Sequence, residues 1–341
     1  MRARFASQTE IKQSRQSQIR PCISIMSLVV LVVTLLACDS QNFGQTAQNQ
    51  AFSQTPTYSN KIDVLWVVDT SGNMTANQQA VVAQIPSFIN SLNQTGLDYQ
   101  IAVTTMDMSA QGDQGKFLSA SGPAVLTDVT PNMGQLLSSR IFVGDYAWHP
   151  LTRGLQAMQA ALSAPNSTVN PGFIRTNSLL VVIFVTASND QSPAADYTAW
   201  LNQLKPPTQF GQMTWVAQFM GVMPGDPNCQ TTTWQYNSPG TAYIALASAS
   251  GGAAVSICSG NLSSAMTNVG QQLLSLATAY PLAQLPNPNS ISVVVNGTKV
   301  ANDATNGWTY VKASNSIQFH GTAIPPAGAS IVVNFQPGSA A

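Results

Sequence analysis

The segment Asp69-Thr70-Ser71-Gly72-Asn73 combines residue types that could bind a divalent cation. It directly follows the apolar run over 62–68, which predicts a buried strand. In a turn, Asp69, Ser71 and Asn73 could direct three oxygen atoms inward, and Mg²⁺ prefers about six oxygen ligands and keeps several waters. A metal with few carboxylate ligands stays electrophilic and could accept a carboxylate from a partner. The alternative is a capping turn that only satisfies amide groups at the start of the next helix.

Strand and helix patterns alternate from residue 61 to about 280 and must position this segment. Strands are expected at 62–68, 99–105, 178–187, 213–222 and 255–258, with an edge strand or hairpin at 117–126. Helices are expected at 73–92, 133–141, 151–162, 194–204, 242–250 and 262–278. The 178–187 segment is the most apolar, so it should be a central strand covered on both faces. The alternation predicts an α/β fold with a doubly wound, mostly parallel sheet, in which ligands bind beyond the carboxyl ends of the strands.

The pattern changes after the prolines at 281, 286 and 288. From there only β patterns follow, at 290–295, 298–301, 308–312, 316–320 and 330–335. Asn296-Gly297 lies between two β-branched runs, which is a strong hairpin signal. We therefore predict a small antiparallel, sandwich-like β domain over 281–341, with Trp308, Tyr310, Ile317 and Phe319 in its core.

The stretch from Asp69 to Met74, together with the strand before it, resembles the first motif of the von Willebrand factor A (vWA) domain. That motif is usually written Asp-x-Ser-Gly-Ser-Met, and here Asn73 replaces the second Ser but still offers an oxygen. The resemblance covers roughly residues 61–280 and implies a Rossmann-like sheet wrapped by helices, with a metal-ion-dependent adhesion site (MIDAS) at its top. It also implies a divalent ion, Mg²⁺ first and Mn²⁺ or Ca²⁺ as alternatives, and a protein ligand that offers an acidic group.

Two further elements of the family's metal site are matched less closely. The second element is a Thr in a loop before a helix, for which Thr152 and His149 are candidates and Asp145 a substitute. The third element is an Asp just after the central strand, where this sequence has Ala187. Asp190, three residues later, could reach the metal from a longer loop. The resemblance thus implies a degenerate site whose metal ligands are Asp69, Ser71, Asn73, Thr152 and Asp190.

The N-terminal region is typical of an export signal. Five basic residues precede an apolar run over 23–37, and this run is shorter than the roughly 20 residues of a spanning helix. The run ends in Leu35-Leu36-Ala37-Cys38, which resembles the lipobox of bacterial lipoproteins. The resemblance implies that Cys38 is lipidated and becomes the mature N-terminus, with residues 39–60 as a flexible tether. The alternatives are an ordinary signal peptide or an uncleaved anchor.

Cys229 and Cys258 are the two cysteines that remain beyond Cys38. In the oxidising compartment that an exported chain enters, we expect them to form a disulfide, and two buried free thiols are the alternative. A zinc site is not favoured, because His149 and His320 are the only histidines in the sequence.

Charge and motif content argue against several function classes. Beyond Cys38 the sequence has eight Lys and Arg, twelve Asp and no basic cluster, so no nucleic acid is expected among the partners. It has no Gly-x-Ser-x-Gly elbow, which makes an envelope hydrolase a poor candidate. We predict a non-enzymatic, lipid-anchored binding, adhesion or scaffold module of the bacterial cell envelope, in the inner or outer membrane. The alternative is a structural envelope lipoprotein whose vWA fold no longer binds metal.

Overall fold

The computed structural model describes residues 61–72, 74–93, 97–144, 151–163, 167–207, 213–229, 238–259, 262–326 and 328–338. All of them belong to the unit of the chain that begins at Gln50. Cys38, the predicted tether, Asn73, Asp145 and His149 lie outside the described residues.

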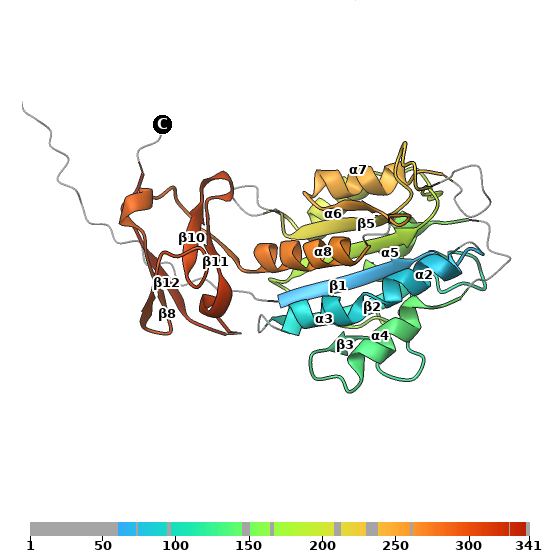
Figure 1. Ribbon diagram of the computed structural model, residues 1–341, viewed down its shortest axis with the longest axis horizontal. Helices are drawn as coiled ribbons and strands as arrows, with labels where there is room; N and C mark the ends of the chain where they lie inside the picture. The colour runs from blue at the N-terminus through green and yellow to red at the C-terminus, as the bar shows by residue number, and fades with distance from the viewer. Residues whose placement is uncertain are drawn as a thin grey trace, which may run out of the picture. The chain divides into compact units, whose positions relative to one another are not determined.

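The strands of the central sheet are β1 (Lys61–Val68), β2 (Asp98–Thr105), β3 (Leu126–Thr127), β4 (Leu179–Thr186), β5 (Trp215–Gly221) and β6 (Ala254–Ser256). Within the described residues they form one six-stranded sheet in the order β3-β2-β1-β4-β5-β6 (Figure 1). Every pairing is parallel except that of β3 with β2. The predicted doubly wound, mostly parallel sheet is therefore confirmed. Because the chain order reverses between β1 and β4, the carboxyl ends of these two strands mark the place where such sheets bind ligands.

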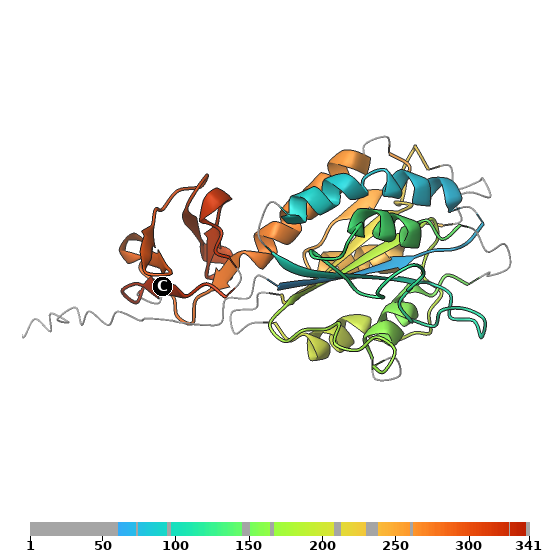
Figure 2. The same ribbon diagram turned by 90° about the horizontal axis from the view of Figure 1, so that it is seen from below.

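Helices cover both faces of this sheet (Figure 2). One face packs against α2 (Thr75–Val82), α3 (Ile85–Asn93), α4 (Met133–Ile141) and α8 (Leu262–Ala277). The other packs against α5 (Gly154–Leu162), α6 (Tyr197–Leu204) and α7 (Thr241–Ala249). All eight residues of β4 are buried, as expected for a central strand with apolar side chains on both sides.

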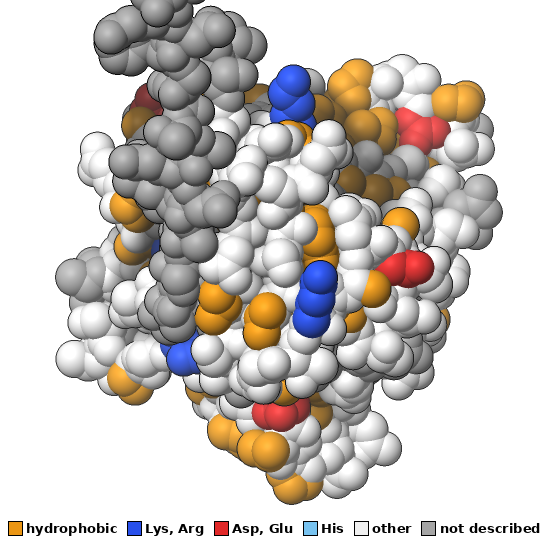
Figure 3. Space-filling model, turned by 90° about the vertical axis from the view of Figure 1, so that its left-hand side faces the viewer, with side chains coloured by type: hydrophobic (Ala, Val, Ile, Leu, Met, Phe, Trp, Pro, Cys, Tyr) orange, Lys and Arg blue, Asp and Glu red, His pale blue; other side chains and the backbone are white. Residues whose placement is uncertain are grey.

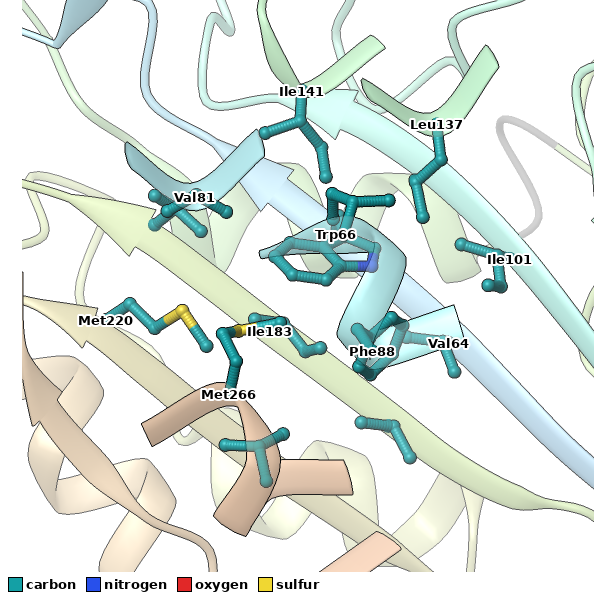
Figure 4. Close-up of a cluster of buried hydrophobic side chains, with 14 of the residues drawn as sticks. Val64, Trp66, Val81, Phe88, Ile101, Leu137, Ile141, Ile183, Met220 and Met266 are labelled. Atoms are coloured by element: carbon teal, nitrogen blue, oxygen red, sulfur yellow. The ribbon is translucent and has the colours of Figure 1, made fainter. Parts of the chain in front are cut away.

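Two hydrophobic layers lie between the sheet and its helices, and we call the one beneath α2, α3, α4 and α8 the first. Trp66 lies in the middle of this first layer (Figure 4). Its ring meets that of Phe88 edge to face, with centroids 5.6 Å apart. Val81, Leu137 and Ile141 bring α2 and α4 onto the same cluster. Trp66 is fully buried, so this aromatic residue beside the motif serves the core and not a surface contact.

Two predicted elements differ from the structure. The single helix expected at 73–92 is divided into α2 and α3, because Pro86 has no N–H to continue the helical hydrogen-bond ladder. The edge strand expected at 117–126 is reduced to the two residues of β3. There the carbonyl oxygens of Pro123 and Ala124 accept hydrogen bonds from the Arg140 guanidinium instead of from a neighbouring strand.

The C-terminal strands are β7 (Ala279–Pro281), β8 (Ser292–Val295), β9 (Thr298–Val300), β10 (Trp308–Val311), β11 (Ser316–Phe319) and β12 (Ile331–Asn334), with short 3₁₀ turns at Pro288–Ser290, Lys312–Ser314 and Gly321–Ala323. They form two antiparallel sheets, β10-β11-β7 and β12-β8-β9, whose buried side chains share one cluster. Trp308, Ile317 and Phe319 lie in that cluster as predicted, whereas Tyr310 is only half-buried and packs against it. Asn296 and Gly297 both have positive φ (48° and 81°), which the expected hairpin turn requires. β7 was not predicted, because it continues directly from the end of α8.

The surface carries few charges. On the face shown in Figure 3, uncharged polar groups and backbone predominate, and hydrophobic side chains occur in small groups. Among the described residues, no helix has the length and apolar character needed to cross a membrane.

Candidate metal centre

Asp69 follows the last residue of β1 and lies at the switch point between β1 and β4. Its N–H donates to the carbonyl oxygen of Val185 (2.9 Å), which holds the loop against the end of β4. Its carboxyl Oδ1 accepts from the Ser71 N–H (2.8 Å), and Oδ2 accepts from the Thr186 hydroxyl (2.7 Å). Asp69 is only 1% exposed. The sequence therefore placed this carboxylate correctly at the carboxyl end of the sheet, and the structure adds Thr186 as its partner.

Burial raises the pKa of the Asp69 carboxyl above its ordinary value, because the charged form loses its contact with water. The hydrogen bond from Thr186 and those from the backbone and side chain of Ser71 act in the opposite direction. Burying a carboxylate is costly even where hydrogen bonds offset part of the penalty, and perturbed carboxyl groups of this kind cluster at functional sites.

Gln78 on α2 holds the back of this loop. Its amide nitrogen donates to the carbonyl oxygens of Asp69 (2.8 Å) and Gly144 (3.2 Å), and its oxygen accepts from the Gly144 N–H (3.0 Å). Gln78 is fully buried, so these bonds form away from water. Gln78 therefore connects the Asp69 loop to the segment after α4. Nothing in the local sequence around Gln78 predicts this role.

Thr152, the predicted ligand from the loop before α5, is brought to the loop after β4. Its hydroxyl donates to the carbonyl oxygen of Asn189 (3.0 Å), and its carbonyl oxygen accepts from the Gln191 N–H (2.8 Å). A second link runs along the same end of the sheet, where the N–H of Arg153 donates to the carbonyl oxygen of Met106. Thr152 is 4% exposed and thus fixed by the fold.

Asp190 belongs to the loop after β4 and lies against the N-terminus of α5. There its carboxylate accepts hydrogen bonds from groups of the protein. Its Oδ1 accepts from the Leu155 N–H (3.1 Å), the Ser192 hydroxyl (2.9 Å) and the Tyr243 hydroxyl (3.0 Å). Its Oδ2 accepts from the Ser192 N–H (3.1 Å). A carboxylate at this position also interacts favourably with the helix N-terminus.

Ala187 occupies the position after the central strand where the vWA resemblance implied an Asp as the third element of the site, and it is fully buried in the hydrophobic cluster that contains Trp66. No group of three or more His, Cys, Asp or Glu side chains gathers as a metal site among the described residues. Any cation here would therefore depend on one carboxylate and on neutral oxygen atoms.

In their chemistry, the oxygen atoms of Asp69, Ser71 and Thr152 suit a hard cation of this kind. The hydroxyl of Thr152 donates its proton to Asn189, so the lone pairs of Oγ1 can face a cation. The Asp69 carboxylate has about four lone-pair sites, and the hydrogen bonds from Thr186 and from the backbone and side chain of Ser71 do not use all of them. Ser71 is half-buried, whereas Asp69 and Thr152 are buried. Carboxylate and hydroxyl oxygens with coordinated waters are what Mg²⁺ and Mn²⁺ accept.

Cys229 and Cys258 form a disulfide, with Cα atoms 5.4 Å apart. The bond connects the segment after β5 to the segment after β6, and Cys229 is buried in the first hydrophobic layer. It therefore links the chain segments that follow β5 and β6, at the carboxyl ends of these strands and at the edge of the sheet opposite β3.

Three residues that hydrogen-bond to the candidate ligands or their loops were not predicted from the sequence. Thr186 could have been found, because it ends the central strand at the same edge of the sheet as Asp69. Gln78 and Tyr243 gave no local signal, since their partners lie 66 and 53 residues away in the sequence.

No protein-family model and no curated protein sequence matches this chain. Among solved structures, it is similar to proximal thread matrix protein 1 (PTMP1) from the mussel byssus, with 13% identity and a TM-score of 0.39, over 69% of this chain and 51% of that one. A structure of the same protein with a zinc-occupied MIDAS motif gives 12% identity and a TM-score of 0.37, over 69% and 51% of the two chains. The pilus adhesin SpaC from Lactobacillus rhamnosus GG, in its open conformation, gives 12% and 0.37, over 83% and 39%. This chain spans about half, or less, of the length of these solved chains.

Proposed function

We propose that this protein is a non-enzymatic binding or scaffold module of a bacterial cell envelope. It is held at a membrane by lipid on Cys38 and uses a divalent cation beside Asp69 to capture an acidic group of a partner protein. The observation that carries the proposal is the position of Asp69, a buried carboxyl group at the switch point of a doubly wound sheet.

Asp69, Ser71 and Thr152 would hold the cation, together with Asn73 from outside the described residues. When bound, the cation supplies an electrophilic position that a partner carboxylate can occupy. The chain's own residues prepare this position. Thr186 orients the Asp69 carboxyl, Gln78 fixes the loop behind it, and burial keeps competing water away.

Isothermal titration of the full chain in detergent with Mn²⁺ and then Mg²⁺ tests the cation. We expect saturable binding by the wild type and a loss of at least tenfold in affinity for Asp69→Ala, because the substitution removes the carboxylate ligand. Asp128→Ala, which removes an exposed carboxylate near β3, should bind as the wild type does. If Asp69→Ala binds the cations as tightly as the wild type does, Asp69 is not a ligand.

The second candidate is a structural envelope lipoprotein whose vWA-like fold has lost its metal. Ala187, buried where the motif has an acidic residue, is the observation that favours it. In that case neither cation would produce heat or raise the melting temperature of the wild type. The same titration therefore separates the two candidates.

The membrane anchor has its own test. Expressed in a bacterium, the wild-type chain should incorporate radiolabelled palmitate and sediment with membranes, whereas Cys38→Ala should do neither. The expected difference is complete, because the thiol is the site of lipid attachment, and stable anchoring needs more than one acyl chain. Cys22→Ala is the matched control and should leave labelling unchanged. Labelled Cys38→Ala protein would contradict the assignment.

A further inference from the structure

We infer that Asp190 and Tyr243 are positioning residues that hold the cation ligand Thr152 in place, and that Asp190 is not itself a ligand. The inference rests on the proposed cation site and gives Asp190, which the sequence predicts as a ligand, a different role there. It follows from how the loop after β4 is joined to the start of α5 and to α7.

The first step is the pairing of the loop after β4 with the start of α5. Four hydrogen bonds connect residues 152–156 to residues 189–192. They are Thr152 Oγ1 to Asn189 O (3.0 Å), Gln191 N to Thr152 O (2.8 Å), Leu155 N to Asp190 Oδ1 (3.1 Å) and Gln156 N to Ser192 Oγ (2.9 Å). Two of the four involve Thr152 itself, so the position of its hydroxyl depends on where this loop lies.

The second step is that Tyr243, on α7, fastens both segments at once. Its hydroxyl accepts from the Gly154 N–H (3.2 Å) and donates to Asp190 Oδ1 (3.0 Å). The side chain is fully buried and packs against Phe184 and Phe219, which are neighbours on β4 and β5, with ring centroids 4.8 and 5.4 Å away. A Cβ on Gly154 would lie 2.6 Å from the Tyr243 hydroxyl oxygen, so a glycine is needed for this approach.

A second bond anchors the loop to α7. The side-chain oxygen of Asn189 accepts from the Ala242 N–H (3.0 Å), next to Tyr243 in the sequence. Asn189 also provides the carbonyl oxygen that receives the Thr152 hydroxyl proton. α7 therefore fixes, through two adjacent residues, the group that sets the orientation of the Thr152 lone pairs.

The third step concerns Asp190, whose Oδ1 accepts three hydrogen bonds within the protein. Turning this carboxylate toward Asp69 would leave the Leu155 N–H and the Tyr243 hydroxyl without their acceptor. Groups that orient metal ligands from behind typically contribute about 10–100-fold to metal affinity. Such a contribution is what we assign to Asp190 and Tyr243.

Mn²⁺ titration of four variants of the full chain in detergent tests the inference. We expect Tyr243→Phe and Asp190→Ala to weaken Mn²⁺ binding by about 10–100-fold. Asp190→Asn should recover most of the loss, because its amide oxygen can still accept from Leu155 and Tyr243. Tyr99→Phe is the matched control. It removes the hydroxyl by which Tyr99, a buried residue of β2, donates to the side-chain oxygen of Asn93 (2.6 Å) at the end of α3, and the variant should bind as the wild type does.

Hydrogen exchange provides a readout that needs no metal. In Tyr243→Phe, the amide protons of Gly154 and Leu155 should exchange faster than in Tyr99→Phe, because their acceptors are removed or released. Wild-type affinity in Tyr243→Phe, or equal losses in Tyr243→Phe and Tyr99→Phe, would overturn the positioning role. A loss for Asp190→Asn as large as that for Asp69→Ala would make Asp190 a ligand. A flat wild-type titration would instead overturn the cation site itself.

Discussion

Replacing Arg175 by Ala is expected to lower the free energy of unfolding by about 3–5 kcal/mol, because it leaves the buried carboxylate of Asp63 without its cation. Asp63 lies near the start of β1, at the opposite end of the strand from Asp69, and its side chain is fully buried. The Arg175 Nε donates to its Oδ1 (2.7 Å), and the Arg175 N–H donates to Oδ2 (2.8 Å). Urea denaturation of the full chain in detergent measures the difference.

Lys205 offsets only part of that loss, since its ammonium group reaches Asp63 through the Ser178 hydroxyl (3.1 Å). Lys205 is itself buried, and burial lowers the pKa of its ammonium group. The pair of Arg175 with Asp98 is more exposed and should contribute less.

Two further variants delimit this prediction. Lys299→Ala removes an exposed charge on β9 and should change the free energy of unfolding by less than about 0.5 kcal/mol. Asp63→Leu combined with Arg175→Met and Lys205→Met should recover much of the stability lost in Arg175→Ala, because this set removes the buried carboxylate together with both cations beside it. If Arg175→Ala costs no more than Lys299→Ala, the ion pair is not a determinant of stability.

Asp69→Asn is expected to stabilise the fold at neutral pH in the presence of a chelator, although it should remove cation binding. Burial raises the pKa of the Asp69 carboxyl in the folded state above its value of 3.8 in the unfolded chain. The folded protein thus holds this proton more tightly than the unfolded chain does. As pH rises from 3.8 through the folded pKa, the wild type loses stability, and above that pKa the penalty is constant.

The Asn side chain carries no charge at any pH, so it avoids this penalty and can still accept from the Ser71 N–H. The stability advantage of Asp69→Asn should therefore be absent near pH 3 and grow as pH rises toward 7. Each unit by which the pKa is raised corresponds to about 1.4 kcal/mol. Chemical denaturation at a series of pH values, with EDTA present throughout, gives the profile.

Asp303→Asn provides a control of opposite sign. The N–H groups of Asn306 and Thr305 donate to Asp303 and hold its pKa below the ordinary value. That carboxylate stabilises the folded state above its unfolded pKa and loses the effect as pH falls through its folded pKa. Asp303→Asn should therefore lower stability at neutral pH and have no effect in acid. If Asp69→Asn also lowers stability at neutral pH, the ionised Asp69 carboxylate stabilises the folded state and the prediction is wrong.

The sequence alone determined the architecture and the position of Asp69. The apolar runs of β1 and β4 predict buried strands because burial on both faces of a parallel sheet demands apolar side chains throughout. A polar loop directly after β1 must then lie at the carboxyl edge of the sheet. These conclusions rest on neighbours in the chain, and local pattern is sufficient for them. Pro86 also predicts a break in the helix, but the regular apolar spacing over 73–92 favoured one continuous helix instead.

Only the tertiary structure decided which polar groups meet at that edge. Asp190 is three residues from the expected acidic position, yet its partners are Leu155 and Tyr243, 35 and 53 residues away. Gln78 reaches Gly144 across 66 residues. Hydrogen-bond geometry is set within a few tenths of an ångström by the packing of whole helices on the sheet, and residue type and spacing carry no record of that packing.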